Sequence, residues 1–277
     1  MSTDTIQTPN PQISAQRRKT ANRWLIRLAQ DSLPVWVFIA LIAAWWAAVA
    51  ILKVPSFLLP PPQDVLPRIW EGRQSLFNHS MITIQEIILG FGLSVVTAIP
   101  LGLLIALSPI AKRMLYPLLV FIQLVPKIAI APLFVVWMGF GLTSKVMLTL
   151  LLTFFPLLLA SIAGFQILDQ RLLYLTRSMG ATTWQTFRYL RFPAALPVIF
   201  GGLKTSATIA ATAAIVAEFV GSNNGLGYIL LQGTANLDTT LVFAVLFLLT
   251  IIGLALNTIV EVVEYVMTPW QRSQGKA

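Results

Sequence analysis

Residues 169–193, DQRLLYLTRSMGATTWQTFRYLRFP, form the one long polar insertion between two strongly apolar runs in the carboxy-terminal half of the chain. Its arginines outnumber its single acid, Asp169; they are Arg171, Arg177, Arg188 and Arg191. Its apolar residues recur at helical spacing: Leu172, Leu173, Leu175, Met179, Trp184, Phe187 and Leu190. This pattern predicts amphipathic helices that dock on something. Another protein is one candidate, and the lipid headgroups are the other.

The composition of the chain indicates an all-α membrane protein. Of its 277 residues 57% are hydrophobic and 10% are charged, and the mean hydropathy is +0.79. A soluble domain has about 25% charged residues, whereas long uncharged apolar runs are typical of membrane spans. With no cysteine and one histidine, His79, disulfides, thiol catalysis and metal sites are not expected.

The basic residues indicate how the chain lies in the membrane. The net charge of +9 would suit nucleic acid, but clusters in short segments beside apolar runs predict topology and no nucleic-acid partner. Residues 1–30 are a polar, basic and disordered cytoplasmic segment by this reasoning, without the features of a cleaved signal peptide. Residues 271–277 form a cytoplasmic tail. Both termini are therefore expected in the cytoplasm.

About six spans are predicted in a permease domain of residues 31–270. They cover roughly residues 33–52, 83–107, 115–138, 146–167, 196–219 and 241–266. Residues 53–81 are assigned to the outer side, with a short amphipathic helix around DVLPRIWEG and His79 in solvent. SPIAKRM, with Lys112 and Arg113, is predicted as a cytoplasmic turn, and Lys145 is assigned to an outer loop. The polar segment 169–193 is then cytoplasmic.

The source of energy is not evident in this chain. There is no Gly-rich phosphate loop ending in Gly-Lys-Ser/Thr, because the one Gly-Lys pair, Gly275 and Lys276, is followed by Ala277. There is also no inverted repeat of the kind that many secondary carriers show. If ATP drives transport here, another chain must bind it.

The polar segment resembles the cytoplasmic loop of ATP-binding-cassette importer permeases. The family pattern is Glu-Ala-Ala, three residues, Gly, nine residues and Ile-x-Leu-Pro. Gly180 and Pro193 match the glycine and the proline, and Leu190 and Phe192 stand for the apolar pair. Tyr174, Leu175 and Thr176 replace Glu-Ala-Ala. The resemblance implies that a helix before Gly180 and another after it form a coupling element against the ATPase subunit. It places these residues there: Tyr174, Thr176, Arg177, Ser178, Met179, Gly180, Ala181 and Pro193.

Most of the membrane portion, about residues 54–270, resembles the nitrate, sulfonate and taurine permeases of binding-protein-dependent importers. The stretches PSFLLPPPQDVLPRIWEG, HSMITIQEIILGFGLSVVTAIPLGLLIAL and AEFVGSNNGLGYILLQG carry this likeness. The last matches a family segment through Glu218, Gly221 and Gly225–Gly227. Gln85 and Glu86 stand where sulfonate-type members carry an arginine. An acid there is similar to permeases for pyrimidine precursors or riboflavin.

Several polar residues within the apolar runs are candidates for a translocation path or gate: Lys127, Thr208, Thr212, Glu218, Gly225 and Gly227. Each has an alternative interpretation. Lys127 could contact an anion on the path, or bind carbonyls freed by Pro126 and Pro132. The threonines could line the path or bond their own backbone, and Glu218 could brace a gate or lie at the interface. Lys204 is expected to reach the cytoplasmic interface. Glu261 and Glu264 are expected to pair with basic loop residues.

Small residues in the fifth predicted span indicate close helix packing. Gly202, Ser206 and Ala210 share the spacing that lets helices approach. The contact could lie within the chain or at the seam of a homodimer.

The hypothesis that follows is a type I ABC importer permease in the bacterial inner membrane. Its partners would be an ABC ATPase, an extracytoplasmic solute-binding protein, a second permease copy and the lipid bilayer. No enzymatic activity and no cofactor of its own are expected, since ATP would be bound by the partner. The alternative is a stand-alone secondary carrier or channel. The substrate stays open.

Overall fold

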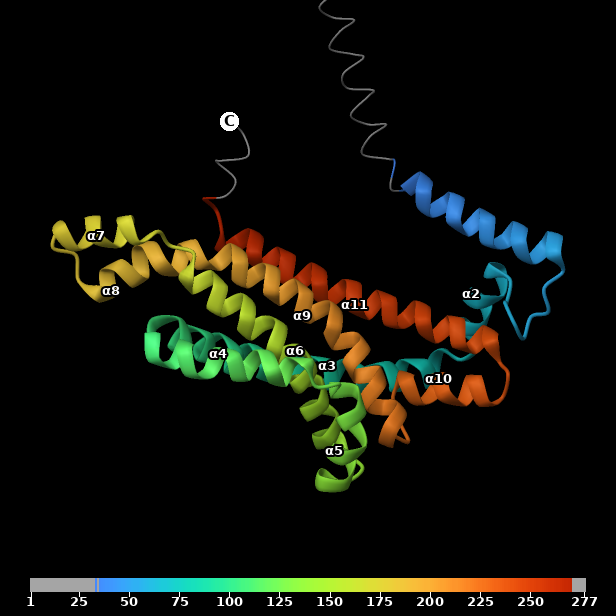
Figure 1. Ribbon diagram of the computed structural model, residues 1–277. Helices are drawn as coiled ribbons and strands as arrows, with labels where there is room; N and C mark the ends of the chain where they lie inside the picture. Colours follow the sequence, from blue (N-terminus) through green and yellow to red (C-terminus); the bar gives the residue numbers. More distant parts are fainter. Residues whose placement is uncertain (1–32, 34, 271–277) are drawn as a thin grey trace, which may run out of the picture. The chain divides into compact units, whose positions relative to one another are not determined.

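The structure, a computed structural model, describes residue 33 and residues 35–270 (Figure 1). The predicted amino-terminal segment, residues 1–30, and the predicted carboxy-terminal tail, residues 271–277, lie outside the described residues. The chain divides into two compact units, residues 1–64 and residues 65–277. The first unit contains the apolar helix Val35–Leu52 and the turns that follow it. The second unit contains the rest of the helices.

The number of helices that can span a membrane agrees with the prediction. Within the described residues, 5 helices are long and apolar enough, or up to 6 if one bent pair counts as a single span. They include α3 (Arg73–Leu107), α6 (Leu142–Gln166), α9 (Phe192–Gly221) and α11 (Thr239–Met267). No strand occurs in the described part of the chain. Many apolar side chains on their outer faces are exposed, as expected of helices in contact with lipid.

The first boundary of α3 differs from the prediction. The short helix α2 (Pro62–Glu71) is present where DVLPRIWEG predicted one, but α3 begins at Arg73, ten residues before the expected span. Residues 73–82 were expected outside the span because several of them are polar. In the structure they are helical, and some of their side chains face inward. His79 is only partly exposed, and its ring accepts a hydrogen bond from the Gly225 N–H at 2.9 Å. The expectation that His79 is solvated was therefore wrong.

The predicted cytoplasmic turn SPIAKRM is instead a break of one residue. The side chain of Ser108 accepts a hydrogen bond from the Ala111 N–H, and Pro109 occupies the first turn of α4 (Pro109–Leu124). Serine at an N-cap and proline just inside a helix both favour immediate helix initiation. Lys112 and Arg113 consequently lie within α4.

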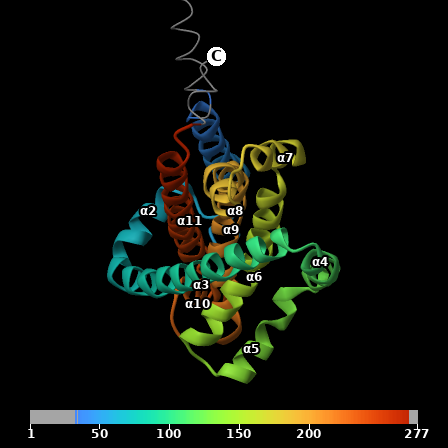
Figure 2. The same cartoon turned by 90° about the vertical axis from the view of Figure 1, so that its left-hand side faces the viewer.

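The third predicted span is the bent pair. The 3-10 helix η1 (Lys127–Ile130) and α5 (Ala131–Met138) follow α4 at an angle of 78°. The break falls at Val125 and Pro126, because Pro126 lacks the N–H that would continue the helix. Pro132 lies in the first turn of α5. Figure 2 shows α4 and α5 on the opposite side of the bundle from α11.

The centre of the second unit is the contact of α6 with α3 and α9. Buried residues from α3 and α6 form one core cluster: Ala98, Ile105, Leu157, Leu158 and Ile162. A side chain at Gly202 would overlap the methyl group of Ala160 in α6. Ser206 donates to the Thr153 carbonyl at 2.9 Å. The small-residue stripe of α9 therefore packs on α6 within this chain, not at a homodimer seam.

The two ends of the bundle carry different structures (Figure 1). At one end are α7 (Gln170–Ser178), α8 (Thr183–Thr186) and the π-helix η2 (Phe187–Arg191). At the other end are residues 222–225 and α10 (Leu226–Ala235). Between these ends Lys204 of α9 pairs with Glu264 of α11 at 2.6 Å. Glu264 was expected to pair with a basic loop residue, but its partner is a lysine on the neighbouring helix.

Candidate functional site

The segment around Gly180 has the two-helix form that the sequence predicts. Asp169 caps α7 by accepting from the Arg171 N–H, and Thr182 and Gln185 form a capping box at α8. Gly180 lies between the helices with φ +76°, a backbone conformation that favours glycine. Its N–H donates to the Arg177 carbonyl and the next N–H donates to that of Thr176, which makes a Schellman motif.

The residues predicted to meet an ATPase lie on an open surface. Tyr174 is 67% exposed and Met179 is 77% exposed. Arg177, Ser178 and Gly180 are also exposed, whereas Thr176 and Ala181 are intermediate. Pro193 lies apart from this surface, in the first turn of α9. Exposed apolar side chains at this end lie along the whole segment: Tyr174 and Leu175 on α7, Met179 at its C-cap, Trp184 on α8 and Tyr189 on η2.

An aromatic chain connects this segment to the spans. Phe187 stacks on Trp184 at 5.8 Å between ring centroids, and it contacts Phe165 of α6 and Phe192 of α9 at 6.4 and 5.9 Å. Beside it, a cavity of about 670 Å³ opens between the segment and the end of α3, lined by Leu103, Leu173 and Arg191 among others. A displacement of α8 would thus reach the spans through Phe187, a residue noted only for its spacing in the sequence.

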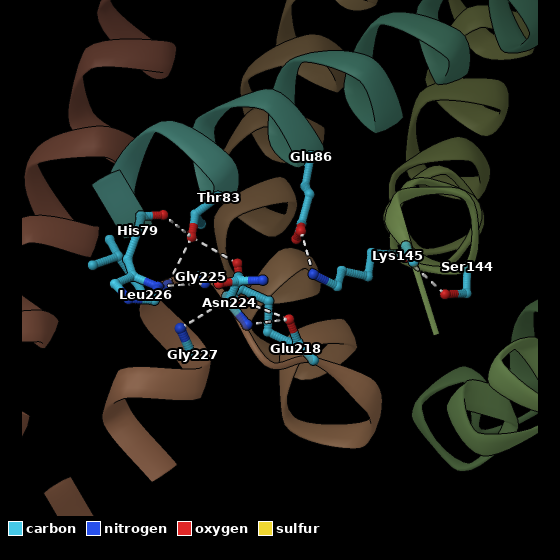
Figure 3. Close-up of polar contacts among 12 residues, drawn as sticks. His79, Thr83, Glu86, Ser144, Lys145, Glu218, Asn224, Gly225, Leu226 and Gly227 are labelled. Carbon is cyan, nitrogen blue, oxygen red and sulfur yellow. Dashed lines mark hydrogen bonds and ion pairs between the residues drawn. The ribbon is translucent and has the colours of Figure 1, made fainter. Parts of the chain in front are cut away.

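A buried polar cluster occupies the other end of the bundle (Figure 3). It consists of Thr83 and Glu86 of α3, Lys145 of α6, Glu218 of α9 and the backbone of residues 225–227. Both glutamates have 0% exposure. Lys145, assigned from sequence to an outer loop, is buried and bonds Glu86 at 2.7 Å. Lys145 is therefore not a loop residue, because it lies in the first turn of α6 and points inward.

Glu218 holds the glycine-rich turn in place. Its carboxylate accepts from the Thr83 hydroxyl at 2.6 Å and from the Gly227 N–H. The Thr83 oxygen in turn accepts the Leu226 N–H at 2.9 Å. Gly225 has φ +107°, and a side chain there would overlap the Glu218 carboxylate. Glu218 therefore braces this turn, and it is not a plain interfacial charge.

The other predicted path residues lie elsewhere. Thr208 and Thr212 line a groove of about 440 Å³ between α9 and α11, together with Thr250 and Asn257. Lys127 does not line that groove. Its ammonium donates to the Gln123 carbonyl at 2.8 Å and lies 4.9 Å from the centre of the Phe155 ring. This contact agrees with the alternative interpretation of Lys127, in which the lysine binds a carbonyl at the break in the helix.

Residues 98–273 match the family model described as binding-protein-dependent transport system inner membrane component. The chain belongs to this family. The match contains the segment around Gly180, Lys145 and Glu218, and it begins after Glu86. This permease is thus a multi-pass protein of the inner membrane, of a class that is not enzymatic.

Individual relatives of this permease cover most of its length. It is 35% identical to the riboflavin transport system permease protein RibX of Chloroflexus aurantiacus, over 87% of this chain and 90% of that protein. It is 35% identical to the formylaminopyrimidine transport permease protein ThiX of Halalkalibacterium halodurans, over 87% and 96%. The taurine transport system permease protein TauC of Escherichia coli is 29% identical over 94% and 96%.

The fold also matches a solved transporter. A chain of the MetNI methionine ABC transporter, in an inward-facing conformation, aligns with a TM-score of 0.56 and 21% identity. The alignment covers 71% of this permease and 98% of that chain. The permease therefore has the type I ABC importer fold, as predicted. Family membership favours the ATP-driven importer over the stand-alone carrier or channel.

Proposed function

We propose that this permease forms the membrane-spanning part of an ATP-driven importer as a homodimer. An ABC ATPase would bind and hydrolyse ATP, and an extracytoplasmic solute-binding protein would deliver the solute. The permease itself would carry out no covalent chemistry and bind no cofactor. The main support is the segment α7–Gly180–α8, which presents exposed side chains and is tied to the spans at its base.

In this proposal α7 is the coupling helix. Its exposed residues, with Tyr174 and Met179 foremost, would fit a groove on the ATPase. Closure of the ATPase pair would then move α7 and α8 as one body, because Gly180 is held by the Schellman bonds. Phe187 would pass this movement to α6 and α9 through its ring contacts.

The same proposal sets the orientation. The α7–α8 end would face the cytoplasm, because its four arginines fit the excess of basic residues in cytoplasmic loops. The end with Glu218 and residues 225–227 would then face outward. There the braced turn would act as part of a gate, and the groove with Thr208 and Thr212 would be part of the path. Lys127 does not line this groove, and one of its three N–H donors bonds the Gln123 carbonyl. Its role on the path stays a prediction.

For the substrate we infer a pyrimidine precursor or a riboflavin-type solute, with nitrate, sulfonate or taurine as the second candidate class. Two observations support the first class. Relatives named for riboflavin and formylaminopyrimidine are both 35% identical to this chain, against 29% for the taurine relative. An acid, Glu86, also stands where the sulfonate-type pattern has arginine. Mass spectrometry of the ligand that co-purifies with the complete complex would test this inference.

The coupling claim is tested by Gly180→Arg. The new side chain would project from a left-handed backbone position into the proposed ATPase contact, so we expect loss of ATPase co-purification and of ATP-driven uptake. Gly139→Arg is the matched control, because Gly139 has φ +79° and equally open surroundings. It should retain the ATPase. If Gly180→Arg leaves assembly and uptake intact, α7 is not the coupling helix.

A further inference from the structure

The buried polar cluster contains more acids than bases. Glu86 and Glu218 are fully buried, and Lys145 is 7% exposed. Among residues 35–270, one further titratable group hydrogen-bonds into the cluster, and it is His79. Its Nδ1 accepts the Gly225 N–H, which requires that nitrogen to carry no proton, so the ring is neutral. With both glutamates ionised, the cluster would carry one uncompensated negative charge, which is costly inside a protein.

The hydrogen-bond donors are distributed unequally between the two carboxyl groups. Both oxygens of Glu218 accept hydrogen bonds, one from the Thr83 hydroxyl and one from the Gly227 N–H. Oε1 of Glu86 accepts from Lys145 at 2.7 Å. No donor in the described part of the chain reaches Oε2 of Glu86, although this oxygen is buried. An ionised carboxylate can only accept, so a buried oxygen without a donor is unfavourable.

The surroundings of this oxygen offer an acceptor. Glu86 lies within electrostatic reach of Glu218 inside the cluster. A carboxylate oxygen can accept more than one hydrogen bond. A proton on Oε2 of Glu86 would therefore have a partner, whereas the bare oxygen faces a like charge. The other charged or titratable side chains near the pair are Lys145 on α6, His79 on α3 and Tyr228, whose ring packs 6.2 Å from that of His79.

We propose that Glu86 binds a proton on Oε2 and donates it to the carboxylate of Glu218, so that Glu86, Lys145 and Glu218 form a proton-binding site without net charge. Lys145 then balances the charge of Glu218, and Glu218 stays ionised to hold the Gly227 N–H and the Thr83 hydroxyl. The proton comes from water and exchanges with it. This site adjoins the proposed outer gate, because Glu218 also holds the braced turn. It lies at the opposite end of the bundle from the segment proposed to contact the ATPase.

Infrared spectroscopy of the full-length chain in lipid bilayers tests the proposal. At neutral pH the wild type should show the carbonyl stretch of one protonated carboxylic acid per chain, with the shift in ²H₂O that an exchangeable proton causes. Glu86→Gln should lose this band while keeping its fold, because an amide is isosteric with the protonated acid. Glu261→Gln is the control, since Glu261 is an exposed acid on α11, and it should keep the band.

Glu218→Gln tests the charge balance. Without the Glu218 charge, Glu86 should ionise beside Lys145, and the band should again be lost. The proposal is overturned if the wild type shows no protonated acid, or if the band survives in Glu86→Gln or in Glu218→Gln. Should Glu86→Gln not fold, the wild-type and Glu218→Gln spectra still decide. The measurement involves neither partner proteins nor uptake, so its outcome is independent of the proposed transport function.

Discussion

Gly225 is the residue on which the braced turn depends most directly. Gly225→Ala would place a side chain at φ +107° and against the Glu218 carboxylate. Strain of this kind costs about 1–3 kcal/mol. We expect a lower unfolding temperature of the purified permease and reduced ATP-driven uptake, measured by thermal unfolding and in proteoliposomes.

The control for this substitution is Gly92→Ala. Gly92 lies within α3, and no heavy atom would lie within 4 Å of the added carbon. Alanine there should leave stability unchanged or raise it slightly, because alanine favours helix more than glycine does. Equal effects of the two substitutions would contradict the role given to Gly225.

Asp238 gives a pH-dependent prediction outside the spans. Its carboxylate caps α11 through the Leu241 N–H at 3.0 Å and bonds Arg68 of α2 at 2.7 Å. Burial raises its pKa, but the hydrogen bonds from Arg68 and Leu241 outweigh burial and hold the pKa below the ordinary value. A group whose pKa is lowered on folding stabilises the protein above its unfolded pKa. This contribution is lost as the pH falls through the folded pKa.

Asp238→Asn should therefore lower the unfolding temperature at neutral pH. The asparagine still caps a helix, so the difference reports mainly on the charge. The gap between wild type and variant should shrink as the pH is lowered below about 4, the ordinary range of aspartate. Thermal unfolding of both proteins across this pH range measures the gap in unfolding temperature. Glu261→Gln serves as the exposed-acid control. A gap that does not change with pH would argue against the ion pair.

Among the helices, the connection between the α7–α8 segment and the spans is the most consequential. Phe187 is the ring that touches both α6 and α9. Phe187→Ala should keep the ATPase bound but weaken coupling by about 1–2 kcal/mol, or roughly 5- to 30-fold in the ratio of solute imported to ATP hydrolysed. Tyr189→Ala, on the same π-helix and 72% exposed, should change this ratio little. Loss of ATPase binding in Phe187→Ala would instead indicate that α8 belongs to the docking surface.

Several helix boundaries could be predicted from the sequence. The short helix around DVLPRIWEG, the bend at Pro126 and the two helices flanking Gly180 were all predicted, because proline, glycine and capping residues act locally. The start of α3 was predicted too late, since hydropathy counts Arg73 and His79 against a span. The partner of His79 lies far along the chain, at Gly225, and no local pattern reveals such a contact.

For the molecule as a whole, the groove between α9 and α11 is the proposed route of the solute. The chain contains no cysteine, so a single introduced thiol can be labelled selectively. Thr212→Cys should react with a membrane-impermeant thiol reagent in the assembled importer, and transported solute should slow the reaction. Val96→Cys, 70% exposed on α3, should face lipid and not react. Equal labelling of both positions would contradict the assignment of this groove to the path.

The sequence by itself determined the class of protein, the number of spans, the segment around Gly180 and the family. These properties follow from hydropathy, from the distribution of basic residues and from local backbone preferences. All three depend on residues that are neighbours in the sequence. Only the tertiary structure decided that the small-residue stripe of α9 packs within the chain and that Glu86, Lys145 and Glu218 meet. Helices from three distant parts of the chain converge there, and the energy of a buried charge depends on which groups surround it, not on which residues precede or follow it.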